Sequence, residues 1–286
     1  MTHRKIKTAF VLLASLMAAC AERPQNDRAM LYVSIAPLQE IVRGIVGDDF
    51  TVGVLVPSGA SPETYEPTPR QYLELARASL IFNVGLIDFE QALLQKLDRS
   101  DRIVDLSRGI EPIAGSCAHH HPKHAHAHGV DPHIWTSPRA LQRMAANAYE
   151  AIRQAYPDST KYTGNYERLQ ERLRELDART SEKLARHGVQ SFVVYHPALS
   201  YYARDYGLEQ IAIEAEGKEP SARRLGDLIR KARERGIRKI LYQRQFPVSV
   251  VETAARDMDA IPVAIDPLRE DAIDNIDEIT DLLTNR

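Results

Sequence analysis

The sequence has little of what defines several classes of protein. Its 286 residues include only two cysteines and one tryptophan, and aromatic residues make up 7% of the chain. Two cysteines allow at most one disulfide, which excludes a disulfide-stabilised scaffold. Basic and acidic residues nearly balance, at 37 against 39, and they are interleaved along the chain. We therefore expect no nucleic-acid partner, because no basic segment stands out to bind phosphates.

The first 19 residues have the pattern of an export signal. A basic segment at 3–7 precedes an uncharged apolar stretch at 9–19. That stretch is too short to cross a bilayer, which takes about 20 residues as a helix. It ends in LMAAC, which resembles the bacterial lipobox and implies cleavage before Cys20 and lipidation of its sulfur. An ordinary signal peptide cut after Ala19 is the alternative.

Loss of this signal would leave a short tether at 20–28 and a soluble chain held to a membrane by a lipid on Cys20. Because the signal holds three positive charges and no acid, the formal net charge would change from −2 to −5 (−2 − 3). Cys117 would then have no partner for a structural disulfide. We expect an extracytoplasmic, lipid-anchored protein, and the sequence leaves open whether the inner or the outer membrane holds it.

Apolar, β-rich runs alternate with segments of helical spacing through the rest of the chain. Helical spacing occurs, for example, at 38–46, 69–78 and 221–235. Strands are expected at 30–35, 52–56, 80–84, 103–106, 192–195, 209–213, 239–242 and 262–265. This alternation favours an α/β fold of parallel sheets with helices on both faces.

One segment, 158–187, breaks the alternation and predicts a single long helix. Its apolar residues recur at steps of three and four and form one stripe, namely Tyr162, Tyr166, Leu169, Leu173, Leu176, Thr180 and Leu184. Asp158 or Ser159 can cap its start, and Gly188 stands where a C-terminal glycine belongs. We interpret it as a rigid strut joining an N-terminal lobe (29–157) to a C-terminal lobe (188–286). A coiled-coil dimerisation helix is the alternative, but the stripe is too short for several heptads, so we expect a monomer.

Histidine is concentrated in the run HHHPKHAHAH, within a predicted loop at 117–129. The run holds six of the ten histidines, which are His119, His120, His121, His124, His126 and His128. Neutral imidazole is the commonest protein ligand for divalent transition metals, so this density indicates metal binding. A segment of this composition cannot pack a core. We interpret it as an accessory loop that collects metal, with Cys117 either a soft ligand there or an ordinary thiol.

Four other positions could form the defined metal site. His196 and Asp266 each directly follow an expected strand, Glu63 lies in the loop after another, and His133 precedes a helix that opens at Pro138. In α/β sheets, ligands bind beyond the carboxyl ends of the strands. Each residue alone has an ordinary explanation as a loop or capping residue. Together with the histidine run, they indicate a site for zinc or manganese.

Several segments also occur in the order typical of one family. They read VPSGASPETYEPTP, GVDPHIWTSP, HPALSYYARDYGL, KEPSARRL and IPVAIDPL. In these the chain resembles the metal-binding solute-binding proteins of bacterial ABC importers (cluster A-I), over nearly the whole mature length. The resemblance implies two lobes that clamp one metal ion, with His133, His196 and Asp266 as ligands. Family members usually have histidine where this chain has Glu63, whose carboxylate can still bind a metal.

The resemblance implies that the protein captures Zn²⁺ outside the cytoplasmic membrane and delivers it to an ABC permease driven by an ATPase. With Glu63, the ligand set resembles that of the manganese members of the family, whereas a histidine-rich loop is a feature of the zinc members. We expect zinc, with manganese or iron as the alternative, because a histidine-rich loop is of little use for an oxygen-preferring ion. A zinc hydrolase and a metal-buffering adhesin lipoprotein are competing functions. We expect no enzyme, because there is no HExxH-like motif and four protein ligands would leave zinc no position for water.

Overall fold

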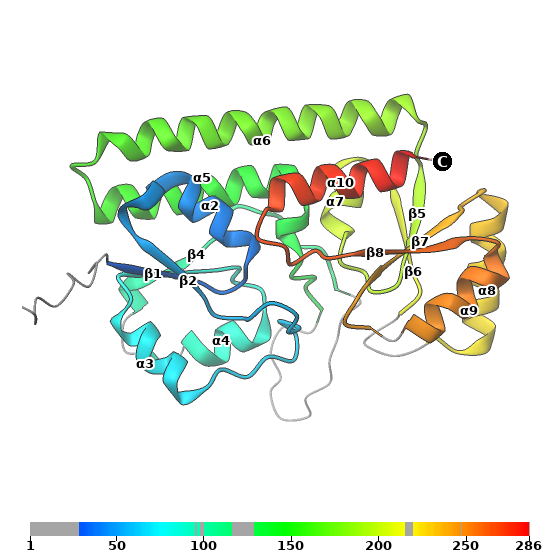
Figure 1. The fold of residues 1–286 in the computed structure, drawn as a ribbon, viewed down its shortest axis with the longest axis horizontal. Coiled ribbons are helices and arrows are strands. Elements are labelled where there is room, and N and C mark those ends of the chain that lie inside the picture. Colours follow the sequence, from blue (N-terminus) through cyan, green and yellow to red (C-terminus); the bar gives the residue numbers. More distant parts are fainter. Residues whose placement is uncertain are drawn as a thin grey trace, which may run out of the picture.

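The computed structural model describes residues 29–94, 96–97, 100–115, 129–214, 220–246 and 248–285 (Figure 1). The predicted export signal, the tether with Cys20, Cys117 and the six histidines of the run lie outside the described residues. Within the described part, no helix combines the length and apolarity that a membrane crossing requires.

Two four-stranded parallel sheets form two lobes, which confirms the predicted fold class. The N-terminal sheet has the order β2-β1-β3-β4, and the C-terminal sheet has the order β6-β5-β7-β8. The two lobes thus repeat one strand order. Every predicted strand is present, displaced by at most two residues at either end. Their bounds are β1 Met30–Val33, β2 Thr51–Val54, β3 Leu80–Asn83, β4 Ile103–Asp105, β5 Ser191–Val194, β6 Glu209–Ala212, β7 Lys239–Gln243 and β8 Ile261–Ile265.

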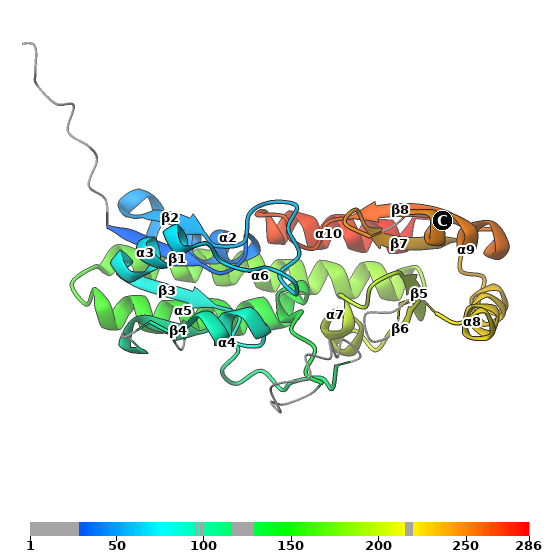
Figure 2. The same cartoon turned by 90° about the horizontal axis from the view of Figure 1, so that it is seen from below.

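Helices cover both faces of each sheet, as Figures 1 and 2 show. The helical segments predicted at 38–46, 69–78 and 221–235 correspond to α2, α3 and α8. The helices of the lobes are α2 Pro37–Val46, α3 Pro69–Arg77, α4 Asp88–Leu94, α5 Pro138–Ala155, α7 Ser200–Asp205, α8 Ala222–Glu234, α9 Val248–Met258 and α10 Ala272–Thr284. Short 3-10 turns are η1 Gly47–Asp49, η2 Ser100–Arg102 and η3 Ile134–Thr136.

The predicted long helix is α6, Thr160–Arg186, whose 27 residues extend about 40 Å across both lobes (Figure 1). The predicted stripe is buried, apart from the half-buried Tyr166. It packs against α5, α2 and α10 of the same chain. Ser159 is the N-cap residue, but its side chain makes no capping hydrogen bond, and Gly188 takes the expected left-handed φ of 62°. Because the chain itself covers the stripe, the stripe does not require a partner helix.

One hydrophobic core joins the lobes. It includes Leu31 and Phe82 of the N-terminal sheet, Phe192 and Leu241 of the C-terminal sheet, and Leu173 of α6. A smaller second core lies between the C-terminal sheet and the helices α8 and α9. Because protein interiors are close-packed, the shared core holds the lobes in one relative position and places the residues between them.

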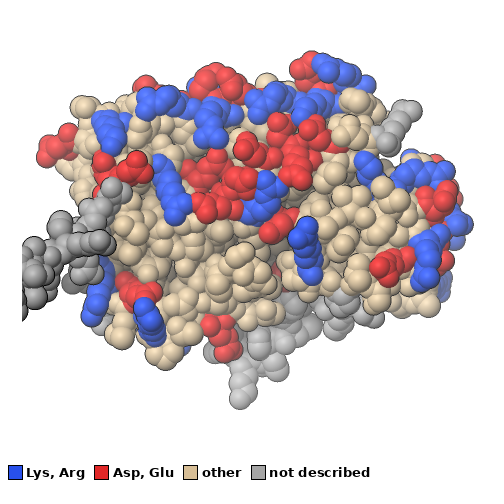
Figure 3. Space-filling model, in the orientation of Figure 1, with Lys and Arg blue, Asp and Glu red and all other residues tan. Residues whose placement is uncertain are grey.

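The surface over α6 and α10 carries interleaved acids and bases, visible in Figure 3. Lys183 of α6 pairs with Asp277 of α10 at 2.8 Å, and Arg172 of α6 pairs with Glu40 of α2 at 2.9 Å. Partly exposed ion pairs at a protein surface each contribute little to stability. They do connect the long helix to both lobes.

Candidate metal centre

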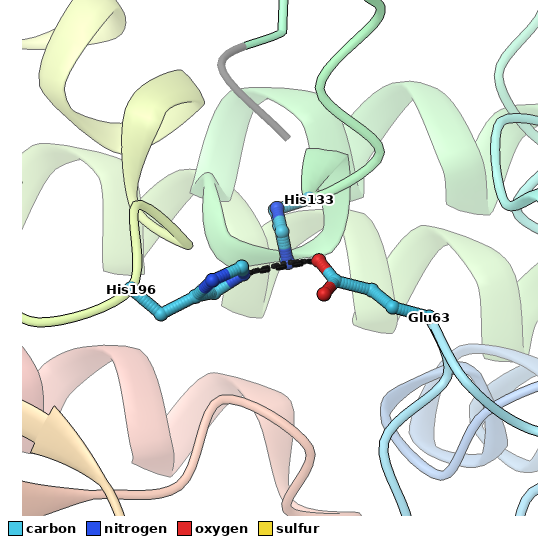
Figure 4. Close-up of side chains that lie close together, drawn as sticks. All are labelled: Glu63, His133 and His196. Carbon is cyan, nitrogen blue, oxygen red and sulfur yellow. Dashed lines mark hydrogen bonds and ion pairs between the residues drawn. The ribbon is translucent and has the colours of Figure 1, made fainter. Parts of the chain in front are cut away.

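Three of the predicted ligands meet between the lobes, as Figure 4 shows. The Nε2 atom of His196 lies 3.0 Å from Oε1 of Glu63 and 3.4 Å from Nε2 of His133. The third edge, from His133 Nε2 to Glu63 Oε1, is 3.8 Å. A tetrahedral zinc ion with bonds of 2.0–2.1 Å has ligand–ligand edges of about 3.3 Å. The three atoms therefore lie close to the spacing that a single zinc ion requires.

The strand register of the C-terminal sheet places His196. β5 lies between β6 and β7, and their pairing brings the residues beyond the strand ends into a row in which His196 lies between Glu214 and Gln243. The side-chain amide of Gln243 donates to the carbonyl of His196 at 3.1 Å, and its oxygen accepts the His196 N–H at 3.4 Å. Glu214 accepts from His196 Nδ1 at 2.9 Å. Both the backbone and the ring of His196 are therefore held in place.

His133 is held by Asp131, two residues before it. Oδ1 of Asp131 accepts from the backbone N–H of His133 at 2.9 Å and from its Nδ1 at 2.7 Å. The segment is also bonded to the C-terminal lobe, since the hydroxyl of Tyr201 donates to the Asp131 carbonyl at 2.7 Å. The Thr136 hydroxyl lies 3.0 Å from the Ala198 carbonyl and can donate to it. These contacts fix His133 relative to His196.

Glu63, His133 and His196 line one pocket together with apolar side chains, among them Ile87, Trp135 and Phe246. Phe246 stacks on the ring of His196 with centroids 5.0 Å apart, and Trp135 lies 5.1 Å from the ring of His133. Both imidazole side chains are buried, whereas the Glu63 side chain is 14% exposed. A cation and a carboxylate attract each other more strongly in such surroundings than in water.

Carboxylates control the protonation of His196. Burial lowers its pKa, but the hydrogen bonds and charges of Glu214 and Glu63 outweigh burial and raise the pKa to about 9. For Asp131, burial raises the pKa, and the charge and hydrogen bonds of His133 outweigh it, so that the pKa lies below its ordinary value. His196 without a bound cation is therefore protonated at neutral pH.

The structure does not bring Asp266 into the group of three. Asp266 directly follows β8, as predicted, but it is exposed, and its carboxylate accepts the Leu268 N–H at 3.0 Å. Its turn does border the pocket through Pro267 and Leu268. Trp135 Nε1 donates to the Pro267 carbonyl at 2.9 Å, which ties this turn to the His133 segment.

Sequence reasoning missed Asp131, Glu214 and Gln243. Glu214 follows β6 as closely as His196 follows β5, so the strand-end argument that selected His196 applies to it equally. Asp131 stands in the DPH segment that supplied His133. The sequence does not show which strands are neighbours in the sheet. It therefore could not show which carboxylate contacts which imidazole.

Comparison with known proteins supports the resemblance seen in the sequence. A family model described as zinc-uptake complex component A, periplasmic, matches residues 31–285. The zinc-binding lipoprotein AdcA of Streptococcus pneumoniae is 28% identical over 282 residues, which cover 92% of this chain and 56% of that protein. The chain thus spans about half the length of this relative. The high-affinity zinc uptake system protein ZnuA of Bacillus subtilis is 29% identical over 278 residues, covering 90% and 86%.

Solved structures show the same similarity. A crystal structure of ZnuA has a TM-score of 0.81 and 33% identity, covering 91% of this chain and 99% of that one. A ZnuA deletion mutant with zinc bound has a TM-score of 0.80, also at 33% identity, with coverage of 91% and 98%. A periplasmic metal-binding protein from Candidatus Liberibacter asiaticus, at 20% identity and a TM-score of 0.74, has the same fold; it covers 89% of this chain and 99% of that one.

Proposed function

The chain belongs to the family of the periplasmic component A of zinc-uptake complexes, and we propose that it is the extracytoplasmic zinc-binding component of an ABC importer. The observation that carries this proposal is the convergence of Glu63, His133 and His196 from separate segments of the two lobes. Two Nε2 atoms and one carboxylate oxygen form a ligand set that zinc accepts. The ion is cargo that the permease and its ATPase would move onward.

Zinc fits the site better than manganese does. Two of the three converging ligand atoms are imidazole nitrogens, and their spacing matches a tetrahedral ion. Manganese prefers more oxygen ligands in an octahedral arrangement. Manganese remains the second candidate because Glu63 supplies a carboxylate.

A fourth ligand would complete the zinc site, and we assign this role to Asp266. Its turn already borders the pocket. With Glu63 and Asp266 both ionised, the two carboxylates would neutralise the ion and so limit the cost of removing it from water. Asp266 lies outside the group of three, so this binding requires its carboxylate to move toward the pocket.

Capture and release would depend on loops more than on motion of whole lobes. The lobes share one core and are joined near the site by the contact between Trp135 and Pro267. Glu63, in contrast, lies in the long connection between β2 and α3 and is the most exposed of the three ligands. We infer that this connection moves when the ion enters or leaves.

The remaining predictions form part of the same proposal. Lipidation of Cys20 would hold the protein to a membrane near its permease, and the histidine run at 119–128 would raise the local concentration of metal. The protein would act as a monomer and without enzymatic activity. Assays of ester, phosphate and peptide hydrolysis with zinc bound would test the hydrolase alternative directly.

Metal analysis of the purified protein tests the central proposal. We expect one tightly bound zinc ion per chain, lost in His133→Ala and His196→Ala and retained in His187→Ala. His187 is the matched control because it is an exposed histidine at the end of α6. Zinc content that is unchanged in the first two variants would refute the proposed site.

A further inference from the structure

Each of the two ligand imidazoles has a buried carboxylate on the nitrogen that faces away from the shared site. Asp131 is 2% exposed and lies 2.7 Å from Nδ1 of His133, and Glu214 is 6% exposed and lies 2.9 Å from Nδ1 of His196. An ionised carboxylate can only accept a hydrogen bond, so in both rings Nδ1 carries the hydrogen. Each Nε2 is thereby left to face the pocket.

We propose that Asp131 and Glu214 are positioning residues that hold both imidazoles as Nε2 ligands of one zinc ion, with Glu214 a determinant of affinity. This inference rests on the zinc-binding function proposed above. Carboxylates behind metal-bound histidines fix the ring orientation and increase the electron density that the ring donates to the metal.

Glu63 lies 3.0 Å from Nε2 of His196 on the pocket side, and on the opposite side of the ring its orientation is left to Glu214. Gln243 holds the backbone of His196, and Phe246 lies against one face of the ring. Neither contact distinguishes one ring edge from the other. The bond from Nδ1 to Glu214 does, because a ring turned over by 180° would present carbon to the carboxylate.

Glu214 can be replaced with less effect on the backbone than Asp131. Its own backbone N–H donates to the Tyr195 carbonyl at 2.9 Å, which does not involve its side chain. Asp131, in contrast, also accepts the backbone N–H of His133, so its replacement would change the local backbone as well. A variant at Glu214 therefore changes the ring contact with little effect on the sheet.

The experiment compares Glu214→Ala and Glu214→Gln with the control Glu209→Gln in the full chain. Glu209 begins β6, the strand that Glu214 follows, and it pairs with Lys231 and Arg235. Zinc affinity is measured by competition with a chelator, and Co²⁺ absorption reports the ligand geometry. We expect the Kd for zinc to rise about 100-fold in Glu214→Ala and about 10-fold in Glu214→Gln, the range for residues behind metal ligands.

The outcomes separate this inference from the proposed function. The Co²⁺ visible bands should shift in Glu214→Ala, because the His196 ring is no longer fixed, and should not shift in Glu209→Gln. If Glu214 had a purely structural role, its replacement would lower the unfolding temperature without changing the Kd for zinc or the Co²⁺ spectrum.

If the wild-type protein binds zinc and both Glu214 variants have an unchanged Kd, the inference about Glu214 is wrong and the proposed function stands. Glu214→Gln preserves side-chain size, so its Kd for zinc tests the role of Glu214 if the alanine variant does not fold. A wild-type protein that binds no zinc would overturn both proposals.

Discussion

The Nε2 atoms of His133 and His196 lie 3.4 Å apart, although one residue comes from each lobe. Two nitrogens this close, with both Nδ1 atoms bonded to carboxylates, need a positive charge between them, since their lone pairs otherwise face each other. A proton on His196 supplies that charge when no metal is bound. Burial opposes this proton, but the carboxylates of Glu214 and Glu63 stabilise it and raise the pKa of His196 to about 9. The site thus has one place that either a proton or a metal ion can occupy.

Zinc binding should release a proton at neutral pH. Because the pKa of His196 is about 9, the zinc-free site is protonated at pH 7, and zinc must displace that proton. Affinity should therefore increase about tenfold per pH unit between pH 7 and 9 and level off above. Calorimetry in buffers of different ionisation enthalpy counts the protons released. An affinity that is constant from pH 7 to 9 would contradict the raised pKa.

Replacement of Glu63 should weaken zinc binding more than replacement of Asp131 or Glu214, the carboxylates that contact the histidine rings. Glu63→Ala removes one of three converging ligand atoms, so we expect the Kd to rise by more than about 100-fold, the upper limit for indirect contacts. Glu66→Ala, an exposed acid three residues later in the same connection, is the control. Equal affinities in the two variants would show that Glu63 is not a ligand.

Deletion of residues 119–128 should leave the tight site intact. The three converging residues, Glu63, His133 and His196, all lie outside the deleted run. We expect one zinc ion per chain at unchanged Kd, with only the weaker, additional zinc equivalents lost in an equilibrium titration. Loss of the tight site on deletion would disprove the accessory role of the run.

Stability without metal should depend on Glu90 in mildly acidic solution. Burial is the largest effect on this residue and raises its pKa to about 7, despite bonds from the N–H groups of Val84, Gly85 and Ile87. The folded state therefore holds a proton that the unfolded state has lost between pH 4.5 and 7. The contribution of the Glu90 proton to the free energy of unfolding is fully present below pH 4.5. It is lost as the pH rises through 7, and the loss amounts to about 3 kcal/mol.

Urea unfolding at pH 4.5 and 7 measures this contribution. Glu90→Gln carries no titrating group, so its stability should lack this part of the pH dependence, even though losing an acceptor destabilises it at every pH. If the stability of Glu90→Gln changes with pH as much as that of the wild type, the pH dependence arises from another residue.

The contact between Trp135 and Pro267 should contribute both to stability and to retention of the ion. Trp135→Phe keeps an aromatic ring but loses the donor that bonds the Pro267 carbonyl, at a cost of about 1 kcal/mol. Zinc should dissociate faster, because the turn that carries Asp266 is less firmly held to the His133 segment. Stopped-flow transfer of zinc to a chelator measures this rate, and a rate equal to that of the wild type would exclude the proposed coupling.

Much of the architecture could be predicted because its signals are local. The strands and α6 follow from the spacing of apolar residues, which depends only on neighbours in the chain. His196 and Asp266 could be selected because a residue that directly follows a parallel strand lies at the edge where ligands bind. The same rule did not indicate that Asp266 turns to the Leu268 N–H, since this depends on its local turn.

The class of fold and the kinds of candidate ligand could be predicted from the amino-acid sequence, because both depend on residue type and short-range order. Which of these side-chain atoms meet depends on the tertiary structure. Glu63, His133 and His196 are separated by 70 and 63 positions, and their spacing depends on a core and a helix shared by both lobes. The pairing of Glu214 with His196 was likewise decided by strand order. Such distances set the electrostatic energies, and with them the raised pKa of His196.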